Sequence, residues 1–201
     1  MKRIIAAVAV MGILALPWAA SSLQAADNTT VDVVMSIQSV DVTLLNGATT
    51  FTVATAVAAK KIVPPEPANL RNTGNFFQDY QVKAEKIADT GGWTQNNLTD
   101  GSPVGVNEYR LRGIWAVFGA TITVNSFETD DVITGTSQTS SATRFFSAAG
   151  TQANVGTTAA NGGFNIPALG ERSLSLLFES GAATTTGSSA ARITITGIAT
   201  P

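Results

Sequence analysis

The sequence predicts an all-β fold, an antiparallel β-sandwich of roughly eight to ten strands that follows a cleaved signal peptide. Apolar and polar residues alternate over several short runs, which is the period of a strand with one buried face. Turn-forming residues separate these runs. The 27 threonines outnumber the 26 charged residues, and β-branched residues favour strands.

The first residues have the pattern of a secretory signal peptide. Lys2 and Arg3 precede an uncharged apolar run over 4–16, which Pro17 and several small residues follow. A run of this length is short of the roughly 20 residues that span a membrane, although an uncleaved anchor is the alternative. We expect cleavage after Ala25, with Ser22 and Ala26 as alternatives, which leaves 26–201 as a single domain. The predicted location is secreted, extracellular or at the cell surface, with the periplasm as the alternative.

The first half of the mature chain predicts three strands and an interruption. In 31–37 alternate residues are apolar, namely Val31, Val33, Met35 and Ile37. Strands over 41–45 and 50–57 flank Asn46-Gly47, a pair typical of a tight hairpin turn. Three prolines in 60–67 remove ladder donors, which predicts a crossing segment or a sheet edge.

The second half predicts further strands over 76–87, 108–118, 171–179 and 192–198, and 121–127 is expected to continue the strand or turn back. Their expected inward residues alternate along each strand: Tyr80, Val82 and Ala84; Tyr109, Leu111, Gly113, Trp115 and Val117; Leu174, Leu176 and Phe178; Ile193 and Ile195. Residues 135–163 are rich in Ser, Thr, Gly and Ala, and are expected to be a long loop region. Short strands at this spacing favour an immunoglobulin-like or jelly-roll sandwich.

The composition excludes several kinds of chemistry. The chain has no His and no Cys, so Ser-His-Asp and Cys-His triads, Cys/His zinc sites and disulfides are ruled out. Without Lys2 and Arg3 the net charge falls from −2 to −4, which does not favour nucleic acid. We therefore predict no cofactor and no enzymatic activity. A pair of carboxylates for glycoside hydrolysis is the remaining kind of catalytic site. Its residues would come from Asp32, Asp41, Asp79, Glu85 and Asp89. These residues fit a solvated face better.

A ligand or partner contact is possible around Trp93, which follows two glycines in a loop. An indole ring stacks on sugars and on partner surfaces, and Asn96, Asn97 and Tyr80 would add polar contacts. The alternative is that Trp93 closes one end of the core. Arg110 and Arg112 share the outward face of their strand, where they form either surface ion pairs with acids such as Glu85 or a carboxylate-binding patch.

The acidic residues Glu128, Asp130 and Asp131 are the weak candidates for a calcium site. Calcium takes six or more oxygen ligands, and these three lack the regular spacing of a calcium loop. A solvated acidic turn is the favoured interpretation, so no metal is predicted.

Three segments carry a resemblance to a known class of domain. Residues 70–82 contain an Asn-Thr-Gly-Asn turn before a Tyr/Val strand, 167–178 place a Gly-led turn before alternating bulky residues, and 193–198 close the chain with another strand. Together they resemble bacterial extracellular immunoglobulin-like surface domains. The resemblance implies adhesion, scaffolding or fibre assembly, and it carries no catalytic residues to this chain.

These observations favour an exported, non-catalytic structural or cell-surface protein, with a self-assembling fibre, coat or matrix subunit as one form. The alternative is a secreted carbohydrate-binding or adhesion module that uses Trp93. Expected partners are further copies of the chain, other envelope or extracellular proteins, or polysaccharide. The alternating residues Val31, Val33, Met35 and Ile37 are the candidate assembly strand, because a strand near a new terminus can pair with a neighbour's sheet edge. Otherwise they form the first strand of their own domain.

Overall fold

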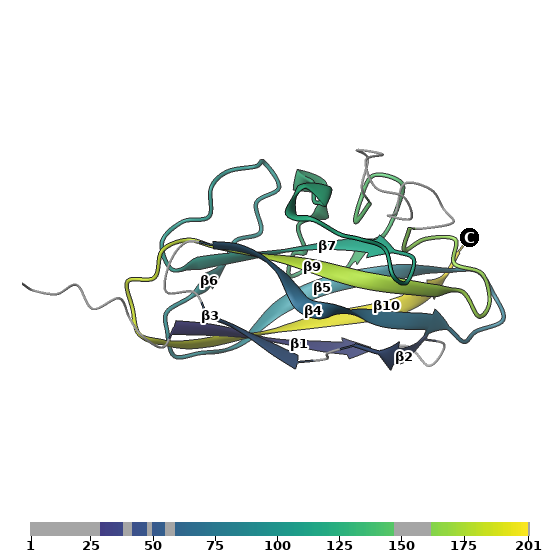
Figure 1. The fold of residues 1–201 in the computed structure, drawn as a ribbon, viewed down its shortest axis with the longest axis horizontal. Coiled ribbons are helices and arrows are strands. Elements are labelled where there is room, and N and C mark those ends of the chain that lie inside the picture. The colour runs from purple at the N-terminus through teal and green to yellow at the C-terminus, as the bar shows by residue number, and fades with distance from the viewer. Residues whose placement is uncertain (1–28, 38–41, 48–49, 55–58, 147–161, 201) are drawn as a thin grey trace, which may run out of the picture.

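The protein folds as a sandwich of two five-stranded sheets (Figure 1). A computed structural model describes residues 29–37, 42–47, 50–54, 59–146 and 162–200. The first sheet has the order β3-β1-β10-β5-β8 and the second the order β2-β4-β9-β7-β6. The predicted all-β sandwich is confirmed.

The strands have the following bounds. The first sheet contains β1 (Thr29–Ile37), β3 (Thr50–Ala54), β5 (Gln78–Asp89), β8 (Gln138–Thr139) and β10 (Gly187–Ala199). The second sheet contains β2 (Val42–Asn46), β4 (Ala59–Asn72), β6 (Thr94–Gln95), β7 (Glu108–Ala116) and β9 (Glu171–Ser180). Two short 3-10 helices follow β7, η1 (Val124–Ser126) and η2 (Thr129–Asp131).

Both sheets are mixed, because two of the strand pairs are parallel. β1 runs parallel to β10, and β6 runs parallel to β7. The other pairings between strands are antiparallel. β1 lies between β10 and β3 and therefore has a hydrogen-bonded neighbour on each side.

The core lies between the sheets and follows the alternation expected from the sequence. The expected inward residues of β5, β9 and β10 are buried, as are Tyr109, Leu111 and Trp115 of β7. Trp115 packs against Tyr80 of the opposite sheet with 4.9 Å between ring centroids. At Gly163, an added Cβ would lie 2.2 Å from the Trp115 ring. The fit around this indole therefore requires a glycine at that position.

The predicted hairpin around Asn46-Gly47 is wrong. β2 pairs with β4 in the second sheet, whereas β3 pairs with β1 in the first. Gly47 has a φ of 104°, and a Cβ there would lie 2.5 Å from the carbonyl oxygen of Pro67. This close approach to β4 requires a glycine, and the chain passes from one sheet to the other after it.

The proline-rich segment is part of a strand rather than a crossing segment. β4 includes the prolines, but its pairing with β9 is interrupted between Val63 and Ala68. β2 pairs only with 69–72, so the prolines fall where neither neighbour needs their missing N–H group. The half of β4 before the prolines has β9 as its one paired neighbour among the described residues, and this half is an edge, as the sequence predicted.

Two loop regions cover the outer face of the second sheet. One runs from β6 to β7, and the other contains η1 and η2, where a strand over 121–127 was expected and is not found. Ile114, Leu177 and Phe127 form a small second hydrophobic cluster beneath the latter. The outward face of β7 is buried by these loops rather than solvated.

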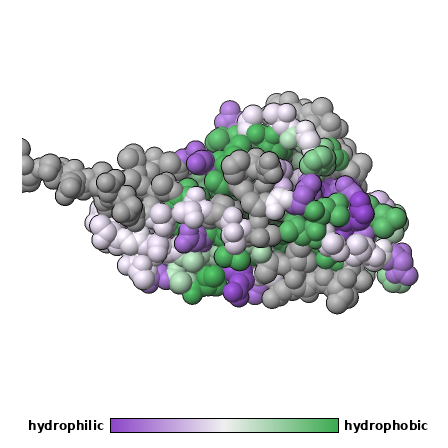
Figure 2. Space-filling view, turned by 60° about the horizontal axis from the view of Figure 1, so that its bottom comes forward, coloured by the Kyte–Doolittle hydropathy of each residue, from purple (hydrophilic) through white to green (hydrophobic). Residues whose placement is uncertain are grey.

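On the face shown in Figure 2, hydrophobic residues lie in several separate areas between hydrophilic ones. No single hydrophobic area dominates the described part of this face. In the described part of the chain, no helix has the length and apolar character needed to cross a membrane.

Candidate functional site: a charged cavity on the outer face of the second sheet

A row of charged residues crosses three adjacent strands of the second sheet. Lys60 of β4 and Arg110 of β7 are both in register with Glu179 of β9. Arg112 lies two residues further along β7 on the same face. Because residues in register across strands lie side by side, the four side chains meet above the central strand β9, near its C-terminal end.

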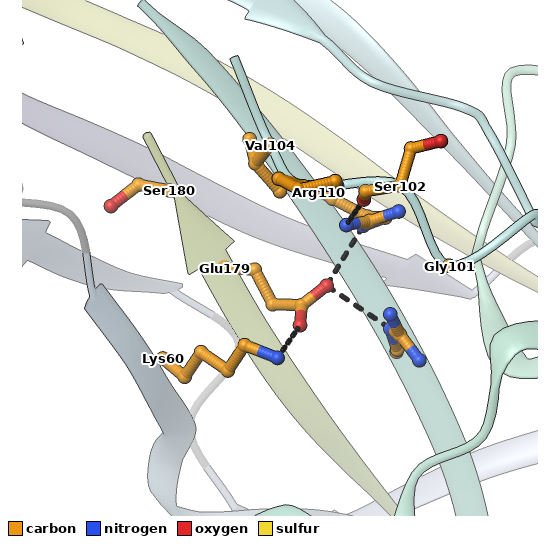
Figure 3. A pocket seen from close by; sticks show the side chains of 9 residues that line it. Lys60, Gly101, Ser102, Val104, Arg110, Glu179 and Ser180 are labelled. Atoms are coloured by element: carbon orange, nitrogen blue, oxygen red, sulfur yellow. Dashed lines mark hydrogen bonds and ion pairs between the residues drawn. The ribbon is translucent and has the colours of Figure 1, made fainter. Parts of the chain in front are cut away.

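The carboxylate of Glu179 lies between the cations (Figure 3). Its Oε2 accepts hydrogen bonds from Nε of Arg110 at 2.8 Å and from Nε of Arg112 at 3.1 Å. Its Oε1 lies 2.9 Å from Nζ of Lys60. This last contact is an ion pair without hydrogen-bond alignment, since Oε1 accepts no hydrogen bond within the described residues.

Backbone carbonyl groups hold the two arginines in place. Arg110 donates from Nη1 to the carbonyl of Leu98 and from Nη2 to that of Ser102. Arg112 donates from Nη1 to the carbonyl of Glu128, at the start of η2. Each arginine is thus attached to one of the loops that cover it. These attachments reduce the rotamer freedom of the guanidinium groups.

A close contact at the end of β9 brings the first of these loops over the row. A Cβ at Gly181 would lie 1.8 Å from the carbonyl oxygen of Gly105, so the two backbones touch. Glu108 accepts a hydrogen bond from the Gly105 amide and another from Asn96. The loop between β6 and β7 is therefore bound at both of its ends.

The row opens into a cavity of about 410 Å³. The four charged residues line it together with Gly101, Ser102, Pro103, Val104 and Ser180. A second hollow of about 330 Å³, beside Phe118 and Pro67, has no charged side chain among the described residues that line it. The charges distinguish the first cavity as the candidate site.

The cavity has an excess of positive charge. Three cations face the one carboxylate of Glu179. Burial by itself would raise the pKa of Glu179, but Lys60, Arg112 and Arg110 together hold that pKa below its usual value. Glu179 is therefore ionised at neutral pH, and the described residues that line the cavity carry three positive charges and one negative charge.

The predicted contacts of Arg110 and Arg112 are wrong in part. Both side chains are buried rather than solvated, and Glu85 forms its ion pair with Lys83 instead. A signal for the true partner was present, since Glu179 extends the outward positions of a strand whose inward residues are Leu174, Leu176 and Phe178. The sequence does not say which strands are neighbours, and this is why the partner was missed.

The residues proposed for a ligand contact around Trp93 do not form an open site. Trp93 and Tyr80 are fully buried in the core and Asn96 is buried, whereas Asn97 is exposed. Trp93 lies in the core, in agreement with the alternative interpretation of this residue. Its ring has no exposed face on which a sugar could stack.

The acidic turn is only partly solvated. Asp130 is exposed, but Asp131 is fully buried. Its carboxylate accepts hydrogen bonds from the amides of Glu128 at 2.7 Å and Phe146 at 3.1 Å. It therefore joins η2 to the backbone at Phe146, which corrects its interpretation as a solvated residue. Among the described residues, no group of three acidic side chains is placed to hold a metal ion.

The candidate assembly strand lies inside its own sheet. Val31, Val33 and Met35 of β1 are buried in the main core, and Ile37 ends the strand in register with Ile195 of β10. In the single chain, β1 is thus a strand of its own domain.

No protein-family model matches the chain, and no curated protein matches its sequence.

Proposed function

We propose that the protein is an exported, non-catalytic structural or cell-surface protein that self-associates by exchanging β1 between copies. Under the predicted cleavage after Ala25, β1 begins within a few residues of the new terminus. A strand near a terminus leaves and re-enters a sheet without threading the rest of the chain. The place of β1 between β10 and β3 is the observation that carries this proposal.

The position that β1 fills is specific for a second copy of the same strand. Nine residues of β1 are in register with β10 and five with β3. The main-chain N–H and C=O groups of β10 and β3 that face β1 therefore require a strand between them. The side chains of Val31, Val33 and Met35 fill the core beneath this strand position. A β1 strand from another copy satisfies the same groups, and this is the general basis of strand exchange.

A disulfide between chains tests the exchange. The side chains of Asp32 and Thr52 face each other on β1 and β3, with Oγ1 of Thr52 donating to Oδ1 of Asp32 at 2.7 Å. The chain has no native cysteine. We would mix D32C protein with T52C protein under oxidising conditions and look for a covalent heterodimer on a non-reducing gel. Directly paired positions are close enough for a disulfide.

The control replaces T52C by T43C, an exposed position on β2 of the other sheet. We expect the heterodimer with T52C and not with T43C, together with filaments or higher mass for wild type in electron microscopy and sedimentation. If only the D32C/T52C double variant forms the bond, and does so within one chain, β1 is not exchanged. The Trp93-based carbohydrate module has lost its stacking surface and is not proposed.

A further inference from the structure

The geometry points to a binding site for the carboxylate of a small acid, of the size of one sugar acid, in the cavity lined by Lys60, Arg110, Arg112 and Glu179. This inference goes beyond strand exchange and does not depend on it, because the cavity lies on the second sheet and β1 belongs to the first.

The donors that remain in the cavity suit an anion. Arg112 uses Nε for Glu179 and Nη1 for the Glu128 carbonyl, and the described residues supply no acceptor for its Nη2. Lys60 carries three N–H donors, and its side chain is 63% exposed although that of Glu179 is 2% exposed. The lysine is thus free to reach an incoming ligand, while the arginines are held in place by backbone carbonyls.

Two nearby acids offset part of the positive charge of Arg110. Asp100 and Glu108 are close enough to Arg110 for its charge to act on them. Neither lines the cavity, and both already accept hydrogen bonds, Asp100 from the Ser102 amide and Glu108 from Asn96 and Gly105. The positive charge that acts on a ligand therefore comes mainly from Lys60 and Arg112, which share Glu179 as their ion-pair partner.

The shape of the cavity selects the class of ligand. Nη2 of Arg112 and Nζ of Lys60 are the charged donors that remain for a carboxylate, and hydrogen bonds from charged donors to a carboxylate are strong. Pro103 and Val104 add an apolar wall for the carbon skeleton of the ligand. A volume of about 410 Å³ is within the usual range for small-molecule sites. A sugar acid combines one carboxylate with a compact ring and fits both features.

Titration with galacturonate tests the site, with galactose as the probe that lacks only the carboxylate. We would follow the Nε signals of the arginines by NMR, since Nε of Arg110 and Nε of Arg112 both donate to Glu179 and should report directly on the cavity. Galacturonate should shift these signals and galactose should not. Equal binding of the two sugars, or tighter binding of inorganic phosphate, would overturn the proposal.

A matched pair of variants places the ligand. Lys60→Gln removes a cavity donor that is largely exposed, so the fold should be kept, and galacturonate binding should weaken roughly tenfold, as expected for a charge-assisted hydrogen bond. Lys61→Gln makes the same change in net charge at the next, exposed residue, which does not line the cavity, and should leave binding unchanged. An equal loss in both variants, or none in Lys60→Gln, rules the site out.

Discussion

Glu179 supplies the negative charge that stabilises two buried arginines on one face of the second sheet. Arg110 and Arg112 both donate to a single one of its oxygens, and both are buried. A buried cation without a counter-ion is strongly unfavourable. The stability of the outer face therefore depends on this carboxylate.

We expect Glu179→Gln to lower the free energy of unfolding by about 3–5 kcal/mol, because it removes the buried ion pairs of both guanidinium groups. Urea denaturation measures the loss. Glu171→Gln is the control, since Glu171 pairs with Arg71 where both side chains are more than a third exposed, and such a pair contributes about 0–1 kcal/mol. Similar losses in the two variants would contradict the special role of Glu179.

Asp131 should make the protein less stable as the pH rises towards neutrality. Burial raises its pKa from 3.8 to about 7, against the backbone hydrogen bonds that lower it. Since the folded-state pKa lies above the unfolded value, the folded protein holds a proton between these two pH values that the unfolded chain has lost. The contribution of Asp131 to stability is greatest below about pH 4, falls up to about pH 7 and is level above it, with a slope of up to about 1.4 kcal/mol per pH unit.

Few other side chains titrate in this window. The chain has no histidine, and the pKa of Glu179 is lowered, so its contribution is present above the usual glutamate pKa and is lost only under more acidic conditions. The change in the free energy of unfolding between pH 5 and 8, measured from denaturation curves, therefore reports mainly on Asp131. The slope should disappear in Asp131→Asn, which is also less stable because the amide nitrogen cannot accept a backbone hydrogen bond. A flat wild-type profile would show that Asp131 stays ionised.

Among the elements, β1 should be indispensable for the fold of a single chain. Its removal would leave β10 and β3 without their shared partner and open the core beside Val53. We expect a variant lacking 26–37 to lose its β-sheet signal in circular dichroism. Under the proposed exchange, a synthetic peptide of residues 29–37 should restore that signal. A truncated chain that folds alone would show that β1 is dispensable.

The loop between β6 and β7 should depend on the glycine contact at the end of β9. Gly181→Ala places a methyl group against the Gly105 carbonyl, and a backbone atom has no alternative rotamer to make room. We expect a loss of about 1–3 kcal/mol, as for other overpacked sites, and a change in the arginine Nε signals in NMR. Gly135→Ala is the control, because its nearest contact would be an ordinary 3.8 Å.

For the whole molecule, the first test is export. Mass spectrometry of the protein recovered outside the cytoplasm should give the mass of a chain that starts at Ala26. A full-length mass in that fraction would overturn the predicted cleavage and favour the uncleaved anchor. The same sample serves for the strand-exchange and galacturonate experiments, both of which concern the mature chain.

The sandwich could be predicted from the sequence because a strand with one buried face alternates apolar and polar side chains with a period of two. The alternations in Tyr80–Ala84, Leu174–Phe178 and Ile193–Ile195 each identify an inward face without knowledge of the neighbouring strands. The same period marked Arg110 and Arg112 as outward residues.

Only the tertiary structure decided what those outward residues do. Local pattern contains no information on strand order, so it could not place β9 between β4 and β7, nor show that β2 and β3 belong to different sheets. It also could not show that loops cover the outer face and convert Arg110 and Arg112 into buried groups. Burial and pairing depend on contacts between segments that are far apart along the chain. The charged cavity therefore exists only once Lys60, Arg110 and Glu179 come together across three strands.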